Sequence, residues 1–252
     1  MFTHAITRLP GKNFYQGLTT SNLGPPDYTL ILQQHHAYRQ TLLSLGLDVV
    51  VLPPEPAFPD AYFVEDPAII TPKIAVITRP GAPSRQGEEA TLEPILKFYR
   101  PVAHISPPGT LDGGDVLMVG EHFFIGLSER TNEEGANQLS TILYSNGYTC
   151  ETVPVSAGLH LKSSVNFIGA NRLLITETLA NNPAFSGFEK IIVDDEEAYA
   201  ANTLYVNHVL LIPKGNPQIY QKLTDMAMRI IQMDVSEVQK MDGGLTCMSL
   251  RF

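Results

Sequence analysis

Short apolar segments recur in pairs along the chain, and a turn containing Gly, Pro or Asn separates the two members of each pair. This pattern is typical of β-hairpins. The second segments begin near residues 74, 122, 172 and 208, at spacings of 48, 50 and 36. The predicted hairpins combine residues 65–70 with 74–78, 114–118 with 122–126, 164–168 with 172–176, and 202–206 with 208–212.

Helical patterns follow the hairpins, and further strands follow the helices. In one of them, Ala136, Leu139 and Leu143 recur at helical spacing, and Gly147 is placed to end the helix in a left-handed turn. Pro94 should kink another helix or confine it to one side. The predicted helices are 28–45, 88–99, 130–146 and 216–231, and the strands after them include 48–52, 148–153 and 232–235.

A repeat of this length indicates an array or a propeller. The fifth copy is split, because residues 243–252 can supply one strand and residues 2–7 its partner. Pairing strands from both termini would remove exposed sheet edges. We therefore predict a five-fold pseudosymmetric α/β propeller of ββαβ repeats, as one domain over residues 1–252. An ordinary mixed sheet is the alternative.

Composition narrows the function. Hydrophobic residues make up 44% of the 252 residues and charged residues 17%, as in globular proteins. The net charge of -9 argues against nucleic acid and mildly favours a small cationic substrate, although it also serves solubility. No signal peptide or membrane span is predicted, and two cysteines form no disulfide framework. We expect a cytoplasmic protein without a metal or other cofactor.

One of the two cysteines, Cys247, follows Asp242-Gly243-Gly244 near the C-terminus. The glycines let the backbone turn and approach a ligand, so the thiol could be a nucleophile. A cysteine in such a position is also often a small buried hydrophobe. The other, Cys150, lies on a predicted strand and reads as a core residue.

Acidic residues stand at the heads of two hairpins. Glu65 and Asp66 are adjacent, so on a strand they should point in opposite directions, and Asp60 precedes them. Crowded carboxylates favour a bound cation, and a guanidinium fits them through paired hydrogen bonds. Asp112 precedes a Gly-Gly pair at the next hairpin, where a tight turn is the alternative.

His160 precedes the third hairpin, at a place in the repeat that matches those of Glu65, Asp112 and Cys247. We interpret the other histidines as structural residues and not as catalytic ones. A cysteine, a histidine and an acid can form a nucleophile, a general acid/base and an orienting group. Together with an acidic cluster, they favour attack on a positively charged carbon.

The chain resembles the dimethylarginine dimethylaminohydrolases, which belong to the pentein, or guanidino-group-modifying, superfamily. The resemblance runs in order over nearly the whole chain, and its pieces are specific only in combination. It rests on the segments FVED (63–66), ITRPGAPSR (77–85), LDGGDVL (111–117), GLSERTN (126–132), GLHLKS (158–163) and LTC (245–247).

The resemblance implies a role for each matching residue. Cys247 would be the nucleophile, His160 the general acid/base and Asp112 the third member. Three acids, Asp60, Glu65 and Asp66, would contact the substrate's polar groups, the guanidinium among them. The remaining implied contacts are Arg85 and Arg130 with the α-carboxylate, Leu18 in a mobile lid, and Met241 through its backbone.

The implied reaction is hydrolysis of asymmetric dimethylarginine or monomethylarginine to citrulline and a methylamine through a covalent thiouronium. An arginine deiminase, an amidinotransferase and, remotely, a non-catalytic protein of the same fold are the alternatives. We expect Cys247 of the free enzyme to be mostly neutral at neutral pH. A zinc ion could inhibit by occupying Cys247 and His160, and the sequence leaves a homodimer open.

Overall fold

The four predicted hairpins all form in the computed structural model, which describes residues 1–156 and 158–252. Two antiparallel strands are followed by a third strand that runs parallel to the second. The strands are β3 (Ala68–Ile70), β4 (Ala75–Ile77) and β5 (Val102–His104); β6 (Val116–Val119), β7 (His122–Leu127) and β8 (Thr149–Pro154); β9 (Val165–Phe167), β10 (Arg172–Thr176) and β11 (Glu189–Val193); and β12 (Leu204–Val206), β13 (Val209–Pro213) and β14 (Ile230–Met233).

The fifth sheet joins the two ends of the chain, as predicted. In it β1 (His4–Arg8) pairs antiparallel with β15 (Leu250–Arg251) and parallel with β2 (Asp48–Leu52). The predicted strand over residues 243–252 was too long, because residues 245–248 form a turn. Their backbone groups bond elsewhere: the Thr246 amide donates to Asn202 Oδ1 at 3.1 Å, and its carbonyl accepts from Arg251 at 3.0 Å.

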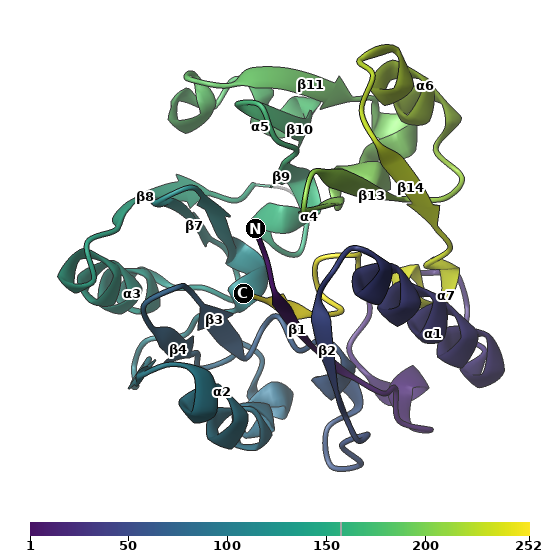
Figure 1. Ribbon diagram of the computed structural model, residues 1–252. Helices are drawn as coiled ribbons and strands as arrows, with labels where there is room; N and C mark the ends of the chain where they lie inside the picture. Colours follow the sequence, from purple (N-terminus) through teal and green to yellow (C-terminus); the bar gives the residue numbers. More distant parts are fainter. Residues whose placement is uncertain (157) are drawn as a thin grey trace.

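The longer helices lie at the periphery, and the sheets are arranged around the middle of the molecule (Figure 1). Gly147 adopts the left-handed conformation just after α3, as predicted, and Gly46 adopts it just after α1. The helices are α1 (Tyr28–Ser44), α2 (Glu93–Tyr99), α3 (Glu133–Ser145), α4 (Leu161–Ser164), α5 (Glu177–Ala180), α6 (Pro217–Asp225) and α7 (Ser236–Gln239).

Two predicted helices end or begin elsewhere than expected. The helix predicted over 216–231 stops at Asp225, because Ala227 turns left-handed (φ 56°) and the chain enters β14 at Ile230. Pro94 lies in the first turn of α2, where its missing N–H costs nothing. The preceding residues, Glu88–Thr91, form a separate 3-10 helix.

Apolar side chains are buried between each sheet and the elements packed on it. In the second unit, Leu139 and Leu143 of α3 pack in one cluster with Phe123 and Ile125 of β7. Burial of each such side chain contributes roughly 1.5–3 kcal/mol. The periodicity of α3 therefore fixes which face of the helix meets the sheet.

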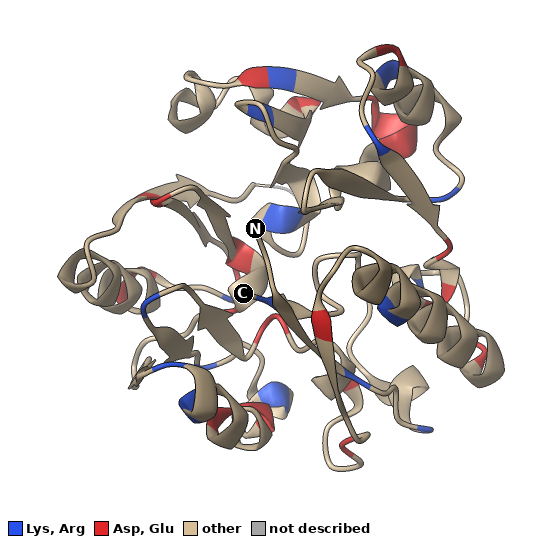
Figure 2. Ribbon diagram, in the orientation of Figure 1, with Lys and Arg blue, Asp and Glu red and all other residues tan. Residues whose placement is uncertain are grey.

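The first strands of neighbouring units contact one another, as β6 does with β9 and β9 with β12. This arrangement is a five-unit α/β propeller whose first strands are innermost. Charged residues occur over the periphery and also in the middle, where α4 carries a basic residue (Figure 2). In the described part of the chain, no helix is long and apolar enough to cross a membrane.

Candidate active site

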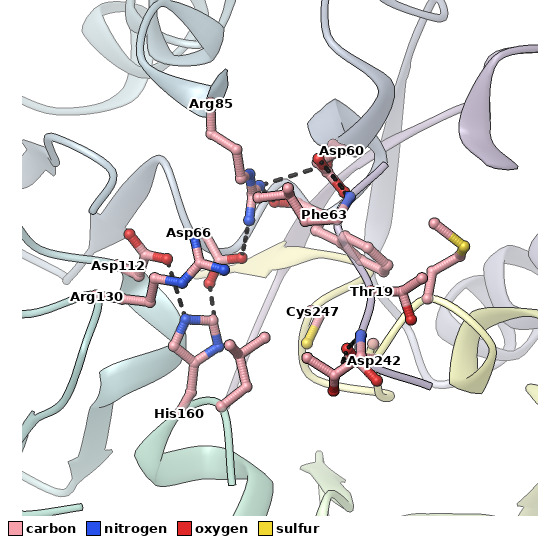
Figure 3. Close-up of a pocket in the computed structure, with 15 residues that line it drawn as sticks. Thr19, Asp60, Phe63, Asp66, Arg85, Asp112, Arg130, His160, Asp242 and Cys247 are labelled. Carbon is pink, nitrogen blue, oxygen red and sulfur yellow. Dashed lines mark hydrogen bonds and ion pairs between the residues drawn. The ribbon is translucent and has the colours of Figure 1, made fainter. Parts of the chain in front are cut away.

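Most of the predicted site residues line one cavity of about 180 Å³. They come from segments that precede the first strands, from the loop before α1, and from the turns after β4 and β7 (Figure 3). The predicted residues in the cavity are Leu18, Asp60, Asp66, Arg85, Asp112, Arg130, His160, Met241 and Cys247. The sequence did not single out Thr19, Thr20, Phe63 and Leu159, and it gave Asp242 and Gly243 only as neighbours of Cys247.

The repeat brings the chemistry-bearing side chains together. Asp112 immediately precedes the 3-10 helix that leads into β6, and His160 immediately precedes α4, which leads into β9. Asp66 lies just before β3, and Cys247 just before β15. Equivalent places in successive units therefore converge on one cavity, which is the arrangement predicted for His160, Asp112 and Cys247.

His160 forms a buried pair with Asp112, from Nε2 to Oδ2 at 3.0 Å. The second oxygen of Asp112 accepts the Gly81 amide at 2.8 Å, which fixes the carboxylate. Burial lowers the pKa of His160, but the charge of Asp66 and the bond to Asp112, with Asp115 adding its charge, raise that pKa to about 9. His160 is therefore protonated at neutral pH, and its Nδ1 lies 4.0 Å from Asp66 Oδ1.

Gly114 makes room for the imidazole. A Cβ at this position would lie 2.6 Å from His160 Nδ1 and 2.8 Å from Asp66 Oδ1. The Gly114 amide donates to Asp66 Oδ1 at 3.0 Å. Gly114 thus serves close packing around His160, whereas a Cβ at Gly113 would lie 2.0 Å from the Glu65 carbonyl oxygen. The sequence motif alone did not distinguish these requirements from a tight turn.

Arg85 is held by acids on two sides. Its Nη1 pairs with Asp66 Oδ2 at 2.5 Å, while Nε and Nη2 bind Glu88 side-on, at 3.0 Å and 2.8 Å. Burial is the main cause that raises the pKa of Glu88 to about 7, although Arg85 opposes it. The sequence analysis did not identify Glu88 as a partner of Arg85. The only indication of this pairing in the sequence is that Glu88 lies three residues after Arg85.

Arg130 differs from Arg85. Its side chain lines the cavity and makes no hydrogen bond or ion pair with any residue in 1–156 or 158–252 (Figure 3). Across the cavity, both oxygens of Asp60 accept the Leu18 amide at 3.1 Å. Burial raises the pKa of Asp60, and Arg85 and Leu18 counteract this. The cavity thus holds the guanidinium group of Arg130 on one side and the carboxylate of Asp60 on the other.

Cys247 is 8% exposed and faces this cavity (Figure 3). Burial raises the pKa of its thiol to about 12, with added repulsion from Glu65 and Asp66. The free site therefore holds a neutral thiol at neutral pH, as expected from the sequence. The preceding glycines lie against other side chains, since a Cβ at Gly243 would strike Phe63.

Glu65 does not line this cavity. It lines a second cavity, while its neighbour Asp66 lines the first. The two acids lie in the turn before β3 and not on a strand, so the alternation predicted for a strand does not apply to them. Glu65 nevertheless lies close to Cys247, because its amide donates to the Cys247 carbonyl at 3.4 Å. Its carboxylate forms ion pairs with Lys162 and Arg251.

Three ligand-type side chains cluster in the described part of the site. Asp66, Asp112 and His160 offer atoms that all lie within 4.8 Å of one another. Because His160 Nε2 is already bound to Asp112, the group has the character of a hydrogen-bonded acid/base pair. Cys247 does not belong to it, and inhibition by zinc at Cys247 and His160 stays a prediction.

Comparison with known proteins relates this site to a defined family. The family model for arginine deiminase matches residues 29–182. The dimethylarginine dimethylaminohydrolase of Pseudomonas aeruginosa is 44% identical over 254 residues, which cover 100% of both chains. The enzyme of the same name from Streptomyces coelicolor is 33% identical over 98% of this chain and 96% of its own.

Solved structures agree with these matches. A cysteine-to-serine variant of the Pseudomonas aeruginosa protein in complex with citrulline superposes with a TM-score of 0.98 and covers 100% of both chains, at 44% identity. The N-terminal domain of ArgZ, an arginine dihydrolase, reaches a TM-score of 0.88 at 17% identity, over 98% of this chain and 97% of that domain. The second likeness shows the shared propeller fold alone.

Proposed function

We propose that this chain, which belongs to the dimethylarginine dimethylaminohydrolase family, hydrolyses Nω-methylated arginine to L-citrulline and a methylamine. The substrates would be asymmetric dimethylarginine and monomethylarginine. The observation that carries the proposal is the cavity that holds Cys247, the His160–Asp112 pair and Asp66 together. Such a set can attack a cationic carbon and protonate the amine that leaves it.

Cys247 would act as the nucleophile. A guanidinium bound beside it would lower a thiol pKa that burial and two acids hold near 12 in the free protein, so that the thiol releases its proton to solvent and becomes the thiolate. The sulfur bonds to the guanidinium carbon, the bond from this carbon to the methylated nitrogen breaks, and His160 gives its proton to the departing amine. Neutral His160 then takes a proton from water, which displaces the sulfur and leaves citrulline.

The remaining residues would hold the substrate. Asp66, together with Glu65, would receive the guanidinium, and Asp60 with the Leu18 and Met241 backbones would bind other polar groups. The α-carboxylate would rest mainly on Arg130, because Arg85 already gives most of its N–H groups to protein acceptors. Closure of the loop around Leu18 over the cavity stays a prediction.

The decisive assay measures citrulline after incubation with asymmetric dimethylarginine, monomethylarginine, free arginine and agmatine. We expect turnover of the methylated arginines and none of agmatine, which lacks the carboxylate that Arg130 would bind. Faster turnover of free arginine would favour an arginine deiminase instead. Transfer of the amidino group to an added amine, without citrulline, would indicate an amidinotransferase, and no turnover at all a binding protein.

We further propose that residues 1–252 act as one catalytic domain in the cytoplasm, without a cofactor. Its partner would be a small cationic amino acid, and neither nucleic acid nor a membrane. Sedimentation of the purified protein at several concentrations tests whether it forms a homodimer. A mass that stays that of one chain at all concentrations would exclude the dimer.

A further inference from the structure

Asp115 is a buried acid that joins three segments of the chain. Its side chain is inaccessible to solvent (0% exposed). Its Oδ1 accepts the Leu161 amide at 2.9 Å, and its Oδ2 accepts the hydroxyls of Ser128 and Thr131 at 2.6 Å and 2.7 Å. One carboxylate therefore ties the 3-10 helix before β6 to the start of α4 and to the turn after β7.

The bond to Leu161 fixes the backbone next to His160. Leu161 is the first residue of α4, and His160 directly precedes it. Burial lowers the pKa of His160, and the negative charge of Asp115 is among those that raise it. Gly126 makes room for this arrangement, because a Cβ there would lie 2.9 Å from Asp115 Oδ1. Asp115 thus acts on His160 through the backbone and through its charge.

The two hydroxyls extend the contacts of Asp115 to two further residues of the site. Thr131 Oγ1 accepts the Asp112 amide at 3.1 Å, and Ser128 Oγ accepts the Arg130 amide at 3.0 Å. Asp112 and Arg130 both line the candidate active site, as His160 does. Three of its residues are therefore one or two hydrogen bonds away from the same carboxylate.

Only a carboxylate suits the groups that face Asp115, because an amide and two hydroxyls all donate to it. Ser128 Oγ already accepts two backbone amides, those of Arg130 and Thr131, so its proton has to be donated elsewhere. Burial raises the pKa of Asp115, and the charge of His160 and the three hydrogen bonds oppose this. An Asn at this position would turn an NH₂ group toward at least one donor.

We infer that Asp115 is a positioning residue, which holds His160, Asp112 and Arg130 in the relative arrangement that the reaction needs. The inference rests on the proposed function for the identity of that reaction. Asp115 is buried away from the substrate and acts only through the three residues that it holds. An acid with a purely structural role would stabilise the fold and leave the chemistry of the site unchanged.

A matched pair of variants separates these two roles. Asp115→Asn is compared with Glu197→Gln, because Glu197 is also a buried acceptor, of the Gln218 and Ile219 amides at 2.9 Å and 2.8 Å, but binds α6. Both variants should unfold at lower urea concentrations than the wild type. Only Asp115→Asn should also lower kcat/KM for asymmetric dimethylarginine, roughly 10- to 100-fold, since hydrogen bonds to a charged group are lost at the site.

The second readout is the pKa of His160, measured by NMR titration of the ring nitrogens in both variants. It should fall by about one unit in Asp115→Asn and stay at the wild-type value in Glu197→Gln. This measurement needs no turnover, so a wild type that releases no citrulline would refute the proposed function and leave the titration to decide the inference. A wild-type pKa of His160 in Asp115→Asn would overturn the inference.

Thr131→Val decides the question if Asp115→Asn does not fold. It keeps every charge and removes only the hydroxyl between Asp115 and the Asp112 amide. Its control is Thr71→Val, which removes an equally buried hydroxyl that bonds backbone groups in the turn between β3 and β4. Thr131→Val should lower kcat/KM about 3- to 10-fold and lower the pKa of His160, because Asp112 is less well held. Equal values of both quantities in the two threonine variants would overturn the inference.

Discussion

Replacing Asp112 by Asn tests the electrostatic basis of the proposed acid/base role of His160. The substitution keeps the size of the side chain and removes its charge. The Gly81 amide, 2.8 Å from Asp112 Oδ1, requires an acceptor there, so the oxygen of the new amide should face Gly81 and its NH₂ should face His160 Nε2. That arrangement makes Nε2 an acceptor and favours the neutral imidazole.

The size of the effect follows from the pKa of His160, which is about 9. A hydrogen bond to a charged group contributes about 1.5–3 kcal/mol, or roughly one to two pKa units. His160 of the variant should therefore titrate near pH 7–8, because the charges of Asp66 and Asp115 still raise its pKa. At pH 8 the protonated fraction of His160 would fall from about 90% to about 10–50%.

The pKa can be measured by NMR titration of histidine ring nitrogens, with a His160→Gln variant to assign the signal. Activity should fall about 2- to 10-fold more at pH 8 than at pH 6, where His160 is protonated in both proteins. A wild-type His160 that titrates near 6.5 would refute the reasoning. So would an Asp112→Asn variant whose loss of activity is the same at both pH values.

Three other predictions follow from single contacts. Gly114→Ala should lower kcat/KM about 100-fold by displacing His160, whereas Gly187→Ala, with no neighbour within 4 Å of its Cβ, should be neutral in the same kinetic assay. The pKa of buried His35 is lowered to about 4, chiefly by burial. The folded protein therefore has the full contribution of neutral His35 to its free energy of unfolding above pH 6.5, and it loses this contribution as the pH falls toward 4. When the free energy of unfolding in urea is measured at pH 7.5 and at pH 5, it should fall by about 2 kcal/mol less in His35→Phe than in the wild type. An equal fall in the two proteins would contradict this. Deleting residues 248–252 removes the buried side chains of Met248 and Leu250, whose burial contributes about 3–6 kcal/mol to the free energy of unfolding. The truncated protein should show no cooperative unfolding transition in calorimetry, and a native-like transition would disprove this.

The repeat was readable from the sequence because hairpins and amphipathic helices depend on local pattern and turn residues. The second strands were predicted to begin near 74, 122, 172 and 208 and begin at Ala75, His122, Arg172 and Val209. The convergence of Asp112 and His160 followed from their equivalent places in the repeat. Boundaries that depend on tertiary contacts were less readable, as the short strand β15 shows.

The direction of a buried side chain and its partners could not be read from the sequence. Nothing local to Glu65 indicates that its carboxylate turns to Lys162 and Arg251, which are 97 and 186 residues away in sequence. Glu88 was missed for the same reason, since its pairing with Arg85 depends on how the loop after β4 folds back. Such contacts decide the electrostatics of the site, and only the packed structure fixes them.

The central claim is that Cys247 attacks a methylated arginine. Mass spectrometry of protein quenched with acid during turnover of asymmetric dimethylarginine measures this most directly. We predict an amidine adduct on the peptide that contains Cys247, with citrulline and dimethylamine released, and neither the adduct nor the products with Cys247→Ser. Citrulline production by Cys247→Ser at the wild-type rate, or an adduct on Cys150 instead, would contradict the account.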